Sequence, residues 1–431
     1  MHTIADAVAP LGSGPLTEDA LARHVRPLFA RALKPGSIHL AHHTLARPLD
    51  RTADDVREAL DAWYDNPSDP WARWRAEVDA FRARVARLIA CSRPDAIVPK
   101  ASAAQGLRAV LNAHATPGTP SVGKPIHVIA TRAESDSTDA ILKTYAARGR
   151  ARITWIDPDE QGFIDAAKVA AAVTMTTDLV VASHVAPATG QVLTGIDAIA
   201  KAIHTVGGLL LLDCSHTAGA IPFDFGRSGA DFAIGACAAY AHAGPGAAWL
   251  AIHPKHLIDE PRPVARRHAL GTLDTGCFAL HDAGTHTQGD EATLASGGDA
   301  WLEGPPAVLP FYQARAGLEL VLAIGVERLG DYNRTQQGFL RDRLADAGVE
   351  VERADPASAG RYGAFLAIPT PNWRTAAESL RTRGVIADAR PLPTTAEGDQ
   401  ARGCLRLAPD LLTTQDELAR AASIVAEAIK A

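Results

Sequence analysis

The sequence predicts an α/β fold, with a large domain built on a parallel β-sheet and a smaller α+β domain after it. Between residues 95 and 255, short and uniformly apolar runs alternate with helical stretches. A parallel sheet covered on both faces by helices requires this pattern. Beyond residue 309, a long amphipathic stretch leads into shorter alternating elements, which is typical of a separate compact unit.

Composition and charge exclude several classes of protein. The 431 residues are 47% hydrophobic and 21% charged, and 43 Lys and Arg against 49 Asp and Glu give a net charge of −6. This balance disfavours a nucleic-acid partner. The longest apolar stretch, residues 207–212, is far short of the ~20 residues that a membrane span needs. We therefore expect no membrane partner. The five cysteines form no Cys-x-x-Cys pair, so we also expect no zinc site and a cytoplasmic location.

The first hundred residues are predicted to be helical. Thr17 is expected to cap a helix start, and a second helix is expected from Thr52 to Trp63. Residues 68–90 carry apolar side chains every three or four positions, which predicts a helix with one buried face. We expect three units: an N-terminal arm that completes the small domain, the large domain, and a linking helix with the small domain. Their predicted bounds are 1–50, 51–308 and 309–431.

The strands of the large domain are expected at the apolar runs, and two of them are expected to form a hairpin through the turn at 244–246. A polar segment at 255–306 is expected to border a site because it is too long for a simple connector. One long helix is expected at 309–329. The expected strands are 96–99, 126–129, 179–182, 209–213, 232–235 and 248–252, followed in the small domain by 349–351, 365–368, 385–387 and 405–407.

Four short segments carry residues suited to binding a phosphorylated cofactor. Residues 99–107 place Ser102 and Ala103 at a helix start, where backbone N–H groups favour a phosphate. Residues 183–191 contain His184 and end in Thr-Gly-Gln, and residues 213–220 begin with Asp213 at a strand end. Residues 235–246 precede a Gly-Pro-Gly turn. In this order the segments resemble the class V aminotransferase group of fold-type I pyridoxal-phosphate enzymes, in its kynureninase-like branch.

The resemblance implies a three-layer large domain with a mostly parallel seven-stranded sheet, and a homodimer. It also implies roles for individual residues. Asp213 would keep the pyridine nitrogen protonated, and His216 would hold the carboxylate or the ring. Arg406 would bind a substrate carboxylate, because a guanidinium suits that task. The other site candidates that it implies are Ser102, Ala103, His184 and Tyr240 for the cofactor, His43 for the substrate, and His216 and His242 for catalysis.

One position departs from the family pattern. Counting back from the Gly-Pro-Gly turn, Ala239 occupies the place of the Schiff-base lysine, and residues 133–139 contain no aromatic ring to stack on the cofactor. Without the lysine, the standard chemistry loses its central group. We therefore expect a repurposed enzyme that acts on a small amino-acid-like carboxylate, with pyridoxal phosphate held non-covalently or with haem or a metal held by histidines. Two alternatives stay open: a non-catalytic partner subunit without a cofactor, and a Lys-to-Ala variant of a conventional lyase or transferase.

Overall fold

The computed structural model describes residues 3–113, 124–263, 270–283, 285, 291–351, 362–392 and 402–430. Its centre is a seven-stranded sheet with the strand order β2-β8-β7-β6-β5-β3-β4. The strands are β2 (Ile97–Lys100), β3 (Ile126–Thr131), β4 (Ala151–Ile156), β5 (Leu179–Ser183), β6 (Leu209–Asp213), β7 (Phe232–Ala236) and β8 (Ala248–Ile252).

The sheet is mostly parallel, as predicted. Only β8 runs against its neighbours, pairing antiparallel with both β2 and β7, while the other pairs are parallel. The expected adjacency of β7 and β8 around the 244–246 turn is therefore confirmed. Strand β4 was not predicted, since it lies at the edge of the sheet and its polar residues Arg152 and Thr154 interrupt the apolar pattern.

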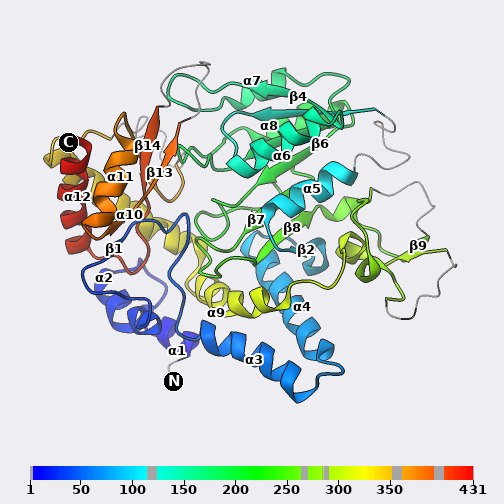
Figure 1. The fold of residues 1–431 in the computed structure, drawn as a ribbon, viewed down its shortest axis with the longest axis horizontal. Helices are drawn as coiled ribbons and strands as arrows, with labels where there is room; N and C mark the ends of the chain where they lie inside the picture. The colour runs from blue at the N-terminus through cyan, green and yellow to red at the C-terminus, as the bar shows by residue number, and fades with distance from the viewer. Residues whose placement is uncertain are drawn as a thin grey trace.

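Helices cover both faces of this sheet and make a three-layer unit (Figure 1). One apolar core joins the sheet to α4 (Trp71–Leu88), α8 (Ile196–Thr205) and α9 (Val308–Ile324), through residues such as Val85, Ile203 and Leu318. A second core on the other face joins it to α5 (Ala103–Ala113) and α6 (Asp136–Ala147), through residues such as Leu107 and Ile141. A short helix, α7 (Ala166–Ala171), packs on α8.

The C-terminal part forms a smaller group of elements beside the large sheet (Figure 1). Its antiparallel sheet has the order β11-β14-β13. Near the N-terminus, β1 (Ile38–His39) pairs in parallel with β12 (Val385–Ile386), so an N-terminal segment joins the C-terminal part in this group. The predicted domain boundaries at residues 50 and 308 are not tested by this pairing and stay a prediction. The other elements of this group are β11 (Leu366–Thr370), β13 (Asp388–Pro391), β14 (Gly403–Leu407), α10 (Val326–Asp346), α11 (Trp373–Thr382) and α12 (Gln415–Lys430).

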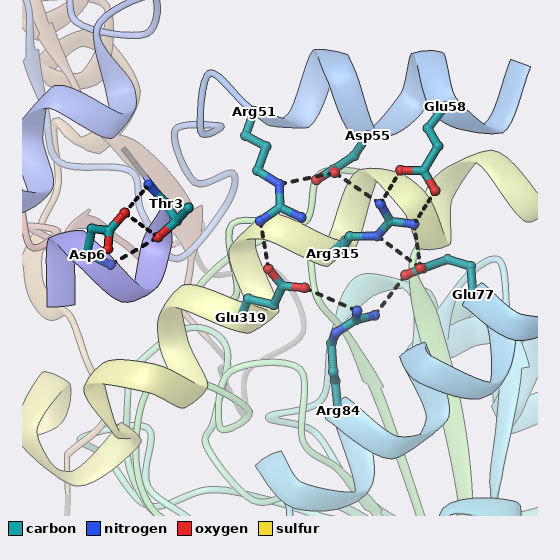
Figure 2. Close-up of polar contacts among 9 residues, drawn as sticks. All are labelled: Thr3, Asp6, Arg51, Asp55, Glu58, Glu77, Arg84, Arg315 and Glu319. Atoms are coloured by element: carbon teal, nitrogen blue, oxygen red, sulfur yellow. Dashed lines mark hydrogen bonds and ion pairs between the residues drawn. The ribbon is translucent and has the colours of Figure 1, made fainter. Parts of the chain in front are cut away.

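The helices that precede α3 (Thr52–Asp65) are short, and α3 itself packs along α9. Helix α1 (Ile4–Val8) starts with a capping box, in which Thr3 and Asp6 bond each other's backbone and side chain (Figure 2). The predicted cap at Thr17 is confirmed, because its hydroxyl accepts from Ala20 N at the start of α2 (Glu18–Ala20).

Two sequence predictions in the C-terminal half are wrong. The expected single helix at 309–329 is broken at Gly325, whose φ of +96° cannot continue an α-helix, so α9 ends at Ile324 and α10 begins at Val326. Residues 349–351 form no strand with any other described segment. Val349 is buried against the small-domain core, which accounts for its apolar character without a strand. Of the polar segment 255–306, residues 264–269, 284 and 286–290 lie outside the described ranges.

A network of charged side chains fastens α3, α4 and α9 to one another (Figure 2). Arg315 is its centre: its guanidinium bonds Glu77 Oε2 at 2.7 and 2.9 Å, and Glu58 Oε2 at 2.6 Å. Its side chain is only 12% exposed, so these contacts are largely shielded from water. The members of the network are Arg51, Asp55, Glu58, Glu77, Arg84, Arg315 and Glu319.

Candidate functional site

Two adjoining cavities open at the edge of the large sheet where its parallel strands end. The inner cavity has a volume of about 180 Å³ and reaches Ser183 and Asp213, the last residues of β5 and β6. The outer cavity has a volume of about 370 Å³ and reaches Thr131, the last residue of β3. Both are lined by His216 and Pro187, so they form one continuous site. The carboxyl ends of parallel strands are the usual place for ligands in α/β folds.

The starts of two helices meet at the inner cavity. Ser102 lies just before α5, and Ser135 caps α6 by accepting from Thr138 N at 3.3 Å. Unpaired N–H groups and the helix dipole favour an anion at each start. The structure therefore brings Ser102 and Ala103 to the place where a phosphate was expected, and adds a second helix start. The inner-cavity residues from these two starts are Ser102, Ala103, Ala104, Ser135, Ser137 and Thr138.

Asp213 supplies a carboxylate at the floor of the inner cavity. It is 6% exposed, and Ser215 N donates to its Oδ1 at 2.9 Å. Burial raises the pKa of Asp213, although hydrogen bonds from Ser215 oppose the rise, and Asp213 forms no ion pair with any described residue. A buried carboxylate that is unpaired in this sense favours a positively charged ligand group beside it.

Glu134 is a half-buried carboxyl of the outer cavity that sequence reasoning missed. It lies in the loop between β3 and α6, and accepts hydrogen bonds from Ser183 Oγ at 2.6 Å and Ser183 N at 3.1 Å. Burial raises the pKa of Glu134 to about 7, and the nearby charge of Asp213 raises it further. A Glu placed just after a buried strand, at the edge where Asp213 also lies, is the signal that could have indicated it.

Four buried side chains near the outer cavity have polar atoms without a hydrogen-bond partner among the described residues. These atoms are both ring nitrogens of His43, Nδ1 of His216, the Tyr240 hydroxyl and Nε of Arg406. The His216 ring centroid lies 6.3 Å from that of His43 and 6.4 Å from that of Tyr240. Folded proteins satisfy nearly all buried polar atoms, so this concentration fits a place for a polar ligand or water.

Electrostatics keep both histidines of this group uncharged. Burial lowers the pKa values of His43 and His216 well below the ordinary value, and the charge of Arg406 lowers them further. The structure does not join His216 to Asp213 by a hydrogen bond, although both line the inner cavity. Of the two roles expected for His216, a contact with the Asp213 carboxylate therefore finds no support among the described residues, and a contact with the cofactor ring stays a prediction.

Arg406 lines the outer cavity from β14, on the side where a substrate carboxylate was expected. Its Nη1 donates to Pro187 O and its Nη2 to Asp388 Oδ2. Burial lowers the pKa of Arg406 to about 10, which still leaves the guanidinium charged at neutral pH.

Three predicted histidines, His43, His184 and His242, are not among the residues that line these two cavities. His184 Nδ1 bonds the Thr217 hydroxyl at 3.0 Å. His242 Nδ1 bonds Arg47 O at 2.8 Å and lines a separate small cavity, which it shares with Tyr240. His242 also has a φ of +52°, a strained conformation for a non-glycine residue. The structure thus separates His242 from Asp213 and brings His216 close to it.

No lysine is among the described residues that line the inner and outer cavities. Ala239 is buried and packs against Ala220, Tyr240 and Ala364. Lys100, at the end of β2, directs its Nζ to Glu303 Oε1 at 3.0 Å and to Trp301 O at 3.1 Å.

The chain is similar to known proteins of one family. The family model of the aminotransferase class-V proteins matches residues 46–389. This chain belongs to the aminotransferase class-V family. The kynureninase of Geobacillus thermodenitrificans (strain NG80-2) is 25% identical over 418 residues, which cover 93% of this chain and 89% of that one.

Solved structures resemble this class V member in fold. A variant of C-DES with glycine covalently linked to its PLP cofactor has a TM-score of 0.75 at 18% identity, over 93% of this chain and 99% of that one. The cysteine desulfurase CsdA from Escherichia coli has a TM-score of 0.72 at 16% identity, over 97% of this chain and 99% of that one. These likenesses support the predicted fold-type I architecture.

The residues of the inner cavity fit pyridoxal phosphate in two respects. The paired helix starts suit its phosphate, and the unpaired carboxylate of Asp213 suits its ring nitrogen. In contrast, the alternative of haem or a metal gains no support, because the described residues contain no group of three or more His, Cys, Asp or Glu side chains placed to hold a metal ion. No helix in the described ranges has the length and apolar character needed to cross a membrane.

Proposed function

We propose that this class V member binds pyridoxal phosphate non-covalently and acts on a small amino-acid-like carboxylate without a Schiff-base lysine. In this proposal Ala239 stands at the lysine position. The observation that carries the proposal is the unpaired carboxylate of Asp213 at the floor of a cavity into which two helix starts also open.

Each part of the cavity has a separate task in this proposal. The N–H groups at the starts of α5 and α6 bind the phosphate, and Asp213 holds a proton on the ring nitrogen. When bound, pyridoxal phosphate supplies an electron-accepting ring. Pro187 and Ala188, which line the outer cavity, help to exclude water from it.

The residues around the outer cavity would bind the substrate and move its protons. Arg406 attracts the carboxylate, because its guanidinium is charged and largely buried. His216 lines both cavities and is our candidate base, because its lowered pKa keeps the ring neutral and its Nδ1 has no hydrogen-bond partner among the described residues. We assign His216 the proton transfer that a lysine amine performs in enzymes that have one.

A spectroscopic titration tests this proposal. Purified protein is titrated with pyridoxal phosphate and the absorbance of the cofactor is followed. We expect saturable binding at micromolar concentrations that dialysis reverses. Replacement Asp213→Ala should weaken binding about tenfold or more, because it removes the charge partner of the ring. The matched control Asp197→Ala removes an exposed carboxylate and should leave binding unchanged. Absence of binding to the unaltered protein would contradict the proposal.

A non-catalytic role is the second candidate, because both terminal nitrogens of Arg406 already donate a hydrogen bond within the protein, to Pro187 and to Asp388, which reduces what they can donate to a substrate. A rate measurement separates the two. A repurposed enzyme converts an added amino acid, such as L-kynurenine or L-alanine, faster than free pyridoxal phosphate does at the same concentration. A binding subunit gives no such increase in rate with any of them.

A further inference from the structure

The pairing of β13 with β14 places the carboxylate of Asp388 beside the guanidinium of Arg406. The two residues lie directly opposite each other in the antiparallel sheet, so their side chains are neighbours on the same face. Nη2 of Arg406 donates to Asp388 Oδ2, while its Nη1 donates to Pro187 O. Arg406 is therefore fixed from two sides, with its side chain only 4% exposed.

Asp388 also connects Arg406 with two other groups of the site. The same Oδ2 lies 3.4 Å from Nε of Arg390 and 3.5 Å from Nε2 of His43. Arg390 and Arg406 both line the outer cavity, whereas Asp388 lines a separate groove together with Ile386. The Asp388 carboxylate therefore contacts both arginines without being among the residues that line the outer cavity.

This arrangement leaves Arg406 with free N–H groups. Nη1 and Nη2 each use one of their two N–H groups in these bonds within the protein, and Nε is buried and has no hydrogen-bond partner among the described residues. A long cationic side chain that is not held in this way would lose rotamer freedom on binding a ligand, which weakens affinity.

We propose that Asp388 is a positioning residue for carboxylate recognition and acts through Arg406. This inference rests on the proposed function, which gives the outer cavity a carboxylate-bearing substrate. Asp388 does not touch the ligand. It sets the orientation of the guanidinium, and with it the preference for a carboxylate over a neutral group of the same shape.

Two probes of similar size measure that preference: benzoate, which is anionic, and benzamide, which is neutral. Neither carries an alkylamine that could react with pyridoxal phosphate. Dissociation constants of both are measured by titration calorimetry for the protein with Asp388 and for Asp388→Asn. We expect the affinity for benzoate to fall about tenfold in the variant, because a charge-assisted contact is misdirected. The affinity for benzamide should stay the same.

The matched control is Asp157→Asn. Asp157 accepts from Nε of Arg132 at 2.8 Å, and Arg132 also lines the outer cavity, but this pair lies at the surface. The control variant should retain the benzoate affinity, which separates the role of Asp388 from a general change of charge near the cavity.

The outcomes distinguish this inference from the proposed function. If the unaltered protein prefers benzoate and Asp388→Asn keeps that preference, the positioning role is overturned and the carboxylate site stands. If the unaltered protein binds both probes equally, the carboxylate site and the positioning role both fail. If Asp388→Asn does not fold, Asp388→Glu replaces it, with an expected loss of several-fold for benzoate alone. An unchanged benzoate affinity in Asp388→Glu then overturns the inference.

Discussion

Ser183 and Glu134 join the ends of two neighbouring strands at the cavity floor. The Ser183 hydroxyl donates to Glu134 Oε2 at 2.6 Å, and the Ser183 N–H donates to Oε1 at 3.1 Å. Burial raises the pKa of this carboxyl to about 7 despite both bonds, and the charge of Asp213 adds to the rise. Below neutral pH, Glu134 and Asp213 together therefore favour one negative charge rather than two.

Glu134 gives the folding stability a pH dependence in the acidic range. Because its pKa is raised from 4.5 to about 7 by folding, the folded state binds more protons between these values. Its stabilising contribution is complete below about pH 4.5 and is lost as the pH rises through about 7. We expect this contribution to reach up to about 3 kcal/mol. Urea unfolding from pH 5 to 8 measures it, and Glu134→Gln should lose this decline. An identical decline in both proteins would contradict the assignment.

His43 and His216 act in the opposite direction. Folding lowers their pKa values from 6.5 by burial, so their contribution to stability is present above pH 6.5 and is lost as the pH falls below it. Replacement of either residue by Gln should make the unfolding free energy less sensitive to acid between pH 6.5 and 5. The exposed His281→Gln serves as the control and should keep the sensitivity of the unaltered protein. Equal slopes in all variants would show that the two rings are not buried in the neutral form.

Arg315 stabilises the contact between α3, α4 and α9. Replacement Arg315→Ala leaves Glu77, whose side chain is 6% exposed, without the bonds from Arg315. Breaking such a shielded pair on one side is costly, and we expect a loss of about 2–4 kcal/mol in unfolding free energy. Chemical denaturation measures the loss.

The control for Arg315 is the exposed pair of Arg334 with Asp331 on α10. Arg334→Ala should change the unfolding free energy by less than about 1 kcal/mol, since surface pairs contribute little. Similar losses in both variants would mean that the network around Arg315 has no special role.

The sequence predicted the central sheet well because its strands are buried on both faces and are uniformly apolar. It did not predict β4, whose edge position allows polar residues, or the break at Gly325, which depends on one backbone angle. For the site, local motifs placed Ser102 and Asp213 in the same cavity. Glu134 and Asp388 were missed because their importance depends on contacts with residues that are distant in the chain.

Ala239→Lys tests whether one substitution accounts for the departure from the family pattern. Ala239 is 7% exposed and packs among Ala220, Tyr240 and Ala364, so a lysine there would overfill the space. Residues 133–139, at and before the start of α6, also supply no aromatic ring to hold the cofactor. We expect the variant to be less stable and to form no bond to pyridoxal phosphate that borohydride can trap. A stoichiometric trapped bond would instead favour a Lys-to-Ala variant of a conventional enzyme.

The most direct measurement is the intact mass of the unaltered protein after incubation with pyridoxal phosphate and borohydride reduction, together with the absorbance spectrum before reduction. We expect a bound chromophore in the spectrum and an unchanged protein mass after denaturation, because no described lysine lines the cavities. A mass increase of one pyridoxyl group, mapped to a lysine, would contradict the claim that this protein holds its cofactor without a covalent bond.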